Sequence, residues 1–125
     1  MLFQVEEGML ARFGDREIHR LLSTWALVYH LEWTARRLLE TCLDDGEEGL
    51  GAGVDVRHLG PAPLGARVLA RAELVRQEPG RFVCRVQAIC EGRPLARGTV
   101  YQAVLARDRL SEILPAGSHR SGSED

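Results

Sequence analysis

The feature that most constrains the fold is a change of hydrophobic period partway along the chain. Between Ser23 and Cys42 apolar residues recur at helical intervals, whereas from Leu50 onward they alternate with polar residues. The first pattern predicts one long helix, with Ser23 or Thr24 as its N-cap, and the second predicts β-strands. Apolar residues cover most of the circumference of the helix in its first half, as expected of a helix that its neighbours bury.

The first strand after the helix ends at a histidine. Ala52, Val54, Val56 and His58 fall on one face of this strand, and that face has to pack against the helix. The segment that follows, LGPAPLG, contains two prolines that lack amide donors. The strand is therefore expected to end directly after His58.

Alternating patterns predict three further strands, over residues 66–75, 82–90 and 94–105. Gly98 is expected to mark a bulge or a close approach of two backbones. Before the helix, a strand with a turn near Gly8 is expected within Leu2 to Arg12, followed by a polar connection from Asp15 to His19. The plan is α+β, an antiparallel sheet wrapped around one helix, whose open edges favour self-association.

Length and composition limit the classes of function. A chain of 125 residues with 45% hydrophobic and 27% charged residues has room for one domain, expected over residues 1–108. Residues 109–125 are expected to form a largely disordered C-terminal tail. The net charge of −2 without a basic cluster argues against nucleic acid as a partner. No window is long enough for a membrane span and no signal peptide is visible, so a cytoplasmic protein without a membrane partner is expected.

The cysteines and the acidic loop have simple interpretations. The three cysteines are odd in number, show no CxxC spacing and lie among apolar residues, which favours core packing over a disulfide, a zinc site or nucleophilic chemistry. The loop from Asp44 to Gly49 lacks the spacing of calcium ligands and is expected to be solvated. We therefore expect no bound metal.

Glu32 and His58 are the candidates for chemistry. Glu32 lies between Leu31 and Trp33, which favours partial withdrawal from water, where an unpaired carboxylate needs a partner. It is either a solvated helical position or an acid, base or nucleophile in a cleft. His58 is either a reachable group at a strand end or a structural histidine.

Arginines on the polar rows of the strands also leave two interpretations open. They are either long side chains over a solvated sheet face or contacts for the phosphates of a nucleotide-tailed ligand. The sequence does not choose among Arg57, Arg67 and Arg97.

Four stretches of the chain resemble one known family. They are STWALVYHLEW, then GLGAGVDVRHLGPAPLGARVLARAEL, GRFVCRV and ARGTVYQAV, which together span roughly Met9 to Arg107. A threonine, a glutamate eight residues later followed by tryptophan, and a V-x-V-x-H-x-x-x-x-P-x-G strand end occur in the same order as in that family. The chain resembles the hotdog-fold acyl-CoA thioesterases, and within them the fluoroacetyl-CoA thioesterase-like group.

The resemblance implies a hotdog fold and the hydrolysis of a small or medium acyl-CoA. It implies Thr24, Glu32 and His58 as the catalytic set, with Glu32 as nucleophile or base and His58 as its proton-transfer partner. Gly51, with Ala52 and Gly53, would bind the substrate, and the Gly51 amide would hold the thioester carbonyl. The resemblance also implies a homodimer or a dimer of dimers with clefts at the subunit interface, and no cofactor beyond the coenzyme A of the substrate.

Two departures from the family pattern narrow this expectation. The N-terminal segment is shorter and has no clear match for the aromatic lid residues that recognise the fluorinated acyl group, so general acyl-CoA hydrolysis is expected rather than specificity for fluoroacetyl-CoA. The residue after Gly98 and Thr99, often histidine in relatives, is Val100. A non-catalytic acyl-CoA-binding module is the alternative function. A hotdog hydratase is a third option, but its expected Asp and His signature is not recognisable.

Overall fold

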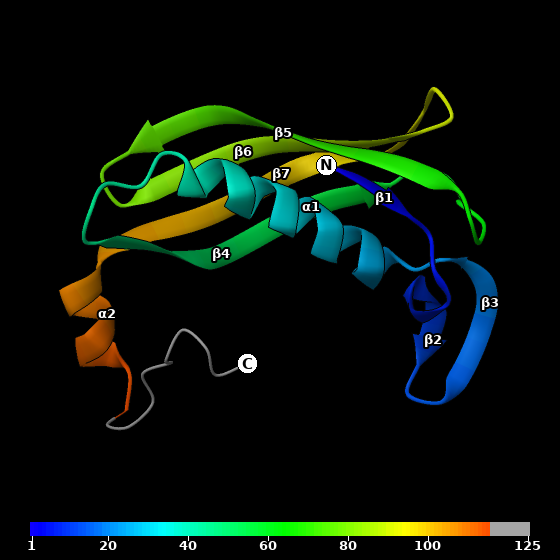
Figure 1. Cartoon of the computed structure of the whole chain (residues 1–125), viewed down its shortest axis with the longest axis horizontal. Coiled ribbons are helices and arrows are strands. Elements are labelled where there is room, and N and C mark those ends of the chain that lie inside the picture. Colours follow the sequence, from blue (N-terminus) through cyan, green and yellow to red (C-terminus); the bar gives the residue numbers. More distant parts are fainter. Residues whose placement is uncertain (116–125) are drawn as a thin grey trace.

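A curled antiparallel sheet packs against one long helix in the computed structural model, which describes residues 1–115 (Figure 1). The sheet has five strands in the order β1-β5-β6-β7-β4, and β2 pairs with β3 in a separate hairpin. The elements in chain order are β1 (Leu2–Gln4), a 3-10 turn (Glu7–Met9), β2 (Leu10–Phe13), β3 (Arg16–Leu22), α1 (Thr24–Glu40), β4 (Glu47–His58), β5 (Arg67–Glu78), β6 (Arg81–Cys90), β7 (Arg93–Ala106) and α2 (Arg107–Ile113).

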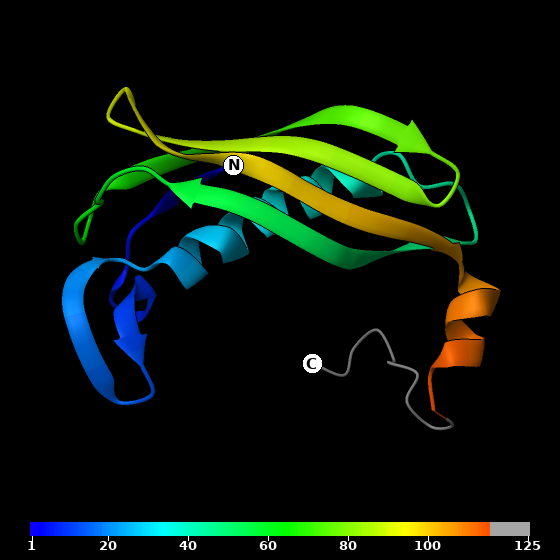
Figure 2. The ribbon, with the colours of Figure 1, turned by 180° about the vertical axis from the view of Figure 1, so that it is seen from behind.

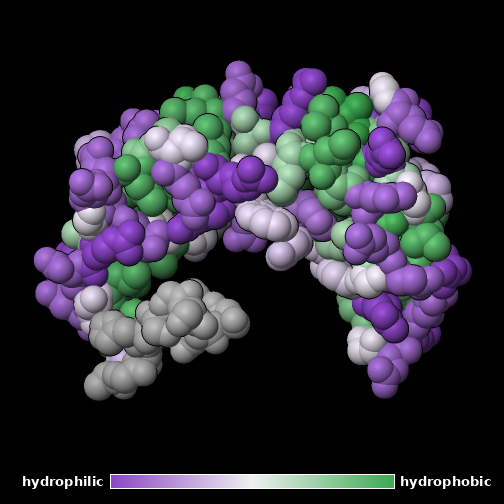
Figure 3. Space-filling model, viewed as in Figure 1, coloured by the Kyte–Doolittle hydropathy of each residue, from purple (hydrophilic) through white to green (hydrophobic). Residues whose placement is uncertain are grey.

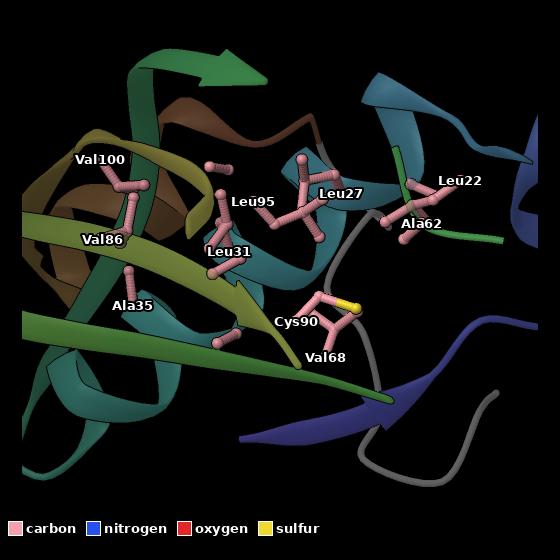
Figure 4. Packing of buried hydrophobic residues seen from close by; sticks show 14 of the residues in the cluster. Leu22, Leu27, Leu31, Ala35, Ala62, Val68, Val86, Cys90, Leu95 and Val100 are labelled. Carbon is pink, nitrogen blue, oxygen red and sulfur yellow. The ribbon is translucent and has the colours of Figure 1, made fainter. Parts of the chain in front are cut away.

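The core lies between α1 and the concave face of the sheet. Ser23 caps α1, because its side chain accepts a hydrogen bond from the Ala26 amide at 3.0 Å. Leu27 and Leu31 of α1 lie among side chains from the sheet strands (Figure 4). The labelled sheet residues of this cluster are Val68, Val86, Cys90, Leu95 and Val100.

One side of α1 is exposed, contrary to the burial predicted around most of its first half. Trp25, Tyr29 and Trp33 recur every four residues and are 44%, 58% and 45% exposed. We call these three residues the aromatic ridge. The helical period was predicted correctly, but a single copy of the sheet covers only one face of the helix.

Strand β4 contains a bulge at Ala52, which has no partner on β7. Gly51 pairs with Gln102 and Gly53 pairs with Tyr101, so one extra residue stands in β4 between these two pairs. An extra residue reverses the alternation of faces along a strand. Gly49 and Gly51 lie against α1 before the bulge, and Val56 and His58 lie on the same side after it. The predicted row is therefore correct from Val54 onward, but Ala52 does not belong to it.

The segment before α1 differs most from prediction. Residues Arg16–Leu22 form strand β3, although a polar connection was expected from Asp15 to His19. Most of β3 is exposed because the β2–β3 hairpin extends away from the main sheet, so the strand shows no apolar alternation. The expected first strand is divided into β1 and β2 by the 3-10 turn Glu7–Met9 around Gly8.

The other boundaries are close to those predicted. β4 ends at His58 as expected, but it begins at Glu47, inside the predicted acidic loop. Helix α2 spans Arg107–Ile113, so the predicted boundary at residue 108 falls within a helix. The tail prediction for residues 116–125 lies outside the described residues. Among residues 1–115, no helix is long and apolar enough to cross a membrane.

The cysteines are part of the core, as predicted. Cys84 and Cys90 are buried, and Cys42 is half-buried against the same cluster. Burial, with a smaller effect of Cys42, raises the pKa of the Cys84 thiol to about 11. A thiol with that pKa is protonated at neutral pH and is a poor nucleophile.

Strand β4 is an open edge of the sheet and runs along the underside of an arch (Figures 1 and 2). The space-filling view shows the hollow below it, between the β2–β3 hairpin at one end and α2 at the other (Figure 3). Leu50 and Val54 of β4 are exposed. Within residues 1–115, nothing therefore covers the outer edge of β4 or the nearby aromatic ridge.

Gly98 is a point of close backbone approach, as predicted. A Cβ at this position would overlap the carbonyl oxygen of Asp55 and come within 2.7 Å of the Cα of Val56. The neighbouring atoms belong to the backbone of β4, so they cannot move aside as a side chain could.

We expect Gly98→Ala to lower the free energy of unfolding by roughly 1 to 3 kcal/mol, because the added methyl forces β4 and β7 apart. Urea denaturation followed by circular dichroism measures the change. Gly8→Ala is the matched control, since a Cβ there meets nothing within 4 Å. Equal stability of the two variants would show that the β4–β7 contact is looser than described.

Candidate active site

The structure brings two of the predicted site residues together. The Oγ1 atom of Thr24 and the Nδ1 atom of His58 lie 2.8 Å apart, at hydrogen-bond distance. Thr24 is the first residue of α1, and His58 is the last residue of β4. Because Ser23 caps the helix, the Thr24 hydroxyl is free for this contact.

Backbone hydrogen bonds hold both ends of this pair in place. The Leu22 amide donates to the Ala62 carbonyl and the Ser23 amide donates to the Met9 carbonyl, each at 2.8 Å. The Leu59 amide donates to the Leu95 carbonyl, also at 2.8 Å. The hydroxyl and the imidazole are therefore presented by fixed segments on either side of the contact.

The environment of His58 favours a neutral imidazole. Burial lowers the pKa of His58, and the backbone of Gly60 acts in the opposite direction with a smaller effect. The Nε2 atom is buried and has no hydrogen-bond partner among the described residues. The exposed route to the imidazole therefore runs through Nδ1 and the Thr24 hydroxyl.

An apolar pocket of about 620 Å³ opens beside the Thr24–His58 pair. Its walls come from the β2–β3 hairpin and from the first turns of α1. Its larger apolar lining residues are Phe13, Ile18, Leu22, Trp25 and Val28. The sequence analysis missed this pocket because it did not predict β3, although Gly14 and Asp15 between two short segments are a hairpin signal. Gly14 adopts the positive φ of 62° that such a turn uses.

Glu32 lies in a different pocket of the same chain. It lines a pocket of about 410 Å³ with Gly51, Tyr29 and Trp33, whereas Thr24 and His58 line the apolar pocket. The Glu32 side chain is exposed, so the predicted withdrawal from water is wrong for the single chain. Eight helical residues rise about 12 Å, which separates Thr24 from Glu32 along α1.

Gly51 leaves room beside the Glu32 carboxylate. A Cβ at Gly51 would come within 3.0 Å of the Oε2 atom of Glu32, so a larger residue would press against the acid. Ala52 is the bulged residue, and Gly53 begins the register on its other side. The three residues therefore form a locally irregular stretch of backbone next to Glu32.

Arg36 fixes this part of β4 to the helix. Its guanidinium donates to the Glu48 carboxylate at 2.7 Å, to the Gly49 carbonyl at 3.0 Å and to Glu40 at 2.9 Å. The hydrogen bond from Arg36, helped by the Gly49 amide, lowers the pKa of Glu48. This arrangement stabilises the backbone that leads into Gly51.

Comparisons with known proteins identify the family of this chain. Residues 5–108 match the family described as fluoroacetyl-CoA-specific thioesterase. The fluoroacetyl-CoA thioesterase of Streptantibioticus cattleyicolor is 30% identical over 105 residues, covering 81% of this chain and 76% of that protein.

Solved structures give the same result. A thioesterase superfamily member from Thermus thermophilus superposes with a TM-score of 0.86 at 30% identity, covering 90% of this chain and 84% of its own. A variant of the fluoroacetyl-CoA-specific thioesterase in complex with fluoroacetate and CoA gives a TM-score of 0.80 at 26% identity, covering 90% and 93%. The curled sheet with its long helix is the hotdog fold of thioesterases. The chain therefore belongs to the fluoroacetyl-CoA-specific thioesterase family, whose members are thioester hydrolases.

Proposed function

We propose that the protein hydrolyses the thioester of a small or medium acyl-CoA in a site that two copies of the chain complete. The observation that carries the proposal is the hydrogen bond between Thr24 and His58 beside an apolar pocket. A family of thioester hydrolases and a structural relative bound to fluoroacetate and CoA support it. The size of the pocket favours apolar acyl groups larger than fluoroacetyl.

Two copies are needed because one chain separates the predicted catalytic groups. Glu32 with Gly51 forms one half of the site, and Thr24 with His58 forms the other. The open edge of β4 and the aromatic ridge offer a self-complementary surface for a two-fold dimer. Such a dimer would bury the ridge and bring Glu32 of one copy towards His58 of the other.

The chemistry follows from these groups. The Glu32 carboxylate takes a proton from water while the water oxygen adds to the thioester carbonyl carbon. The Gly51 amide donates a hydrogen bond to the oxyanion that develops. The carbon–sulfur bond then breaks, leaving a carboxylic acid, which ionises, and the thiolate of coenzyme A.

The leaving sulfur takes up the proton that came from water. Glu32 passes this proton through the Thr24 hydroxyl to Nδ1 of the neutral His58, and the same hydroxyl then relays it from Nδ1 to the sulfur. The lowered pKa of His58 suits this role, since a neutral imidazole can accept a proton and release it again. Water, the protein side chains and the Gly51 backbone amide supply all the groups for this reaction, and coenzyme A enters only as part of the substrate.

The shared site predicts complementation between inactive variants. Glu32→Ala and His58→Ala should each abolish hydrolysis, but a mixture that exchanges subunits should recover about a quarter of wild-type activity. Half of the dimers are then mixed, and each mixed dimer has one site with both groups intact. A thiol-release assay on the refolded mixture measures the recovery.

The control is either variant refolded alone, which should stay inactive. Native mass spectrometry establishes that mixed dimers form. Mixed dimers without recovered activity would contradict a site shared between chains. Wild-type protein that binds acyl-CoAs but hydrolyses none of a varied panel would instead favour a non-catalytic acyl-CoA-binding module.

The lowered pKa of His58 predicts the pH profile. The neutral imidazole is the active form, and it persists below the ordinary histidine pKa of about 6.5. We expect kcat/KM to stay level between about pH 8 and pH 7 and to fall only below about pH 6.5. Initial rates in overlapping buffers measure the profile, and an acidic limb centred above the ordinary value would contradict this role.

The apolar pocket predicts the acyl preference. Phe13→Ala removes a wall of the pocket from an exposed position on the hairpin. We expect kcat/KM for a medium-chain acyl-CoA to fall about tenfold, while acetyl-CoA changes less than about twofold, because only the longer chain reaches this wall. Leu64→Ala, an exposed leucine outside the pocket, is the control. Equal losses on both substrates would place the acyl group elsewhere.

A further inference from the structure

The face of the sheet turned away from α1 carries two rows of polar side chains that differ in charge. Register pairs across four strands define each row. The arginine row consists of Arg57, Arg97, Gln87 and Arg71. The mixed row beside it consists of Asp55, Thr99, Arg85 and Glu73.

The arginine row has no internal compensation. Arg57 and Arg97 stand directly opposite each other on β4 and β7, and like charges in that position destabilise a sheet. Neither makes a salt bridge within residues 1–115, whereas Arg85 of the mixed row pairs with Glu73 at 3.2 Å. If this face of the sheet were only solvated, alternating opposite charges as in the mixed row would give a more stable sheet than two opposed arginines. The opposed arginines therefore indicate an anionic ligand.

A groove of about 730 Å³ runs over these arginines and reaches the catalytic strand end. Arg57, Arg97, His58 and Leu59 all line it. His58 also lines the apolar pocket on the other side of the sheet, so the two spaces meet at the end of β4. His58 is the last residue of β4, so no further residue of that strand separates the two spaces there.

We infer that Arg57 and Arg97 bind the phosphate groups at the nucleotide end of coenzyme A. The inference rests on the proposed function, since it takes the thioester to lie at His58 with its acyl group in the apolar pocket. The rest of the substrate then leaves the site at the strand end, where the groove begins. Guanidinium groups bind phosphate oxygens with paired hydrogen bonds, and two of them side by side suit a ligand with several phosphates.

The same geometry distinguishes Arg57 and Arg97 from Arg67, the third arginine considered as a phosphate contact. Arg67 pairs with Gln4 at the far edge of the sheet and does not line the groove. Asp55 does line it, from the mixed row, and offers an acceptor for a neutral hydroxyl or amine next to the anion site. Besides Arg85, which pairs with Glu73, the groove thus holds one carboxylate and two arginines that make no salt bridge within residues 1–115.

The first test measures binding without catalysis. Isothermal titration calorimetry with free coenzyme A should give a dissociation constant about tenfold higher for Arg57→Gln/Arg97→Gln than for wild type. Arg67→Gln, a matched arginine outside the groove, should stay within about twofold of wild type. An unchanged affinity of the double variant would overturn the inference.

Two further arms identify the ligand chemistry and guard against misfolding. Adenosine 3′,5′-bisphosphate should compete with coenzyme A, and equal competition by the same concentration of inorganic phosphate would reduce the groove to a general anion site and overturn the assignment. Arg57→Lys/Arg97→Lys should bind coenzyme A more tightly than the glutamine double variant, because it restores both charges. No recovery with lysine would count against an electrostatic role.

A kinetic arm distinguishes this inference from the proposed function. The ratio of kcat/KM for an acyl-CoA to that for the same acyl group on pantetheine should fall about tenfold in Arg57→Gln/Arg97→Gln and stay constant in Arg67→Gln. Hydrolysis with an unchanged ratio would support the thioesterase activity and contradict phosphate binding by Arg57 and Arg97. Wild-type protein that binds coenzyme A through these arginines but hydrolyses no thioester would support the phosphate site and contradict the thioesterase activity.

Discussion

One extra residue in β4 determines which groups can face the helix. The bulge at Ala52 reverses the alternation of the strand, so Gly51 before it and His58 after it lie on the same side of the sheet. In a regular strand these two positions would point to opposite faces, because they differ by an odd number of residues. Both candidate halves of the active site therefore depend on a single irregular backbone position.

Much of the fold could be predicted because the strongest patterns are local. The helical period of α1 and the prolines after His58 each determine a boundary without help from distant residues. Gly98 was identified because a glycine inside a strand usually marks a close backbone approach, and Asp55 and Val56 provide it. The buried cysteines followed from their apolar neighbours in the same way.

The remainder depends on contacts that no local pattern encodes. Strand β3 is exposed over most of its length, so it lacks the apolar alternation by which a strand is recognised. The bulge at Ala52 depends on the register with β7, which the sequence of β4 alone does not determine. Thr24 contacts His58, which is 34 residues away in sequence, and no pattern within the helix indicates that contact.

The aromatic ridge has a consequence for spectroscopy. Trp25 and Trp33 are the two tryptophans of the chain, and both belong to this exposed strip of α1 rather than to the core. Intrinsic fluorescence from this protein therefore reports the polarity around one outer face of a helix. A shift of the emission maximum would show that the aromatic ridge becomes covered or uncovered. A change in the packing around Leu27 and Leu31 in the core would have little effect on the same measurement.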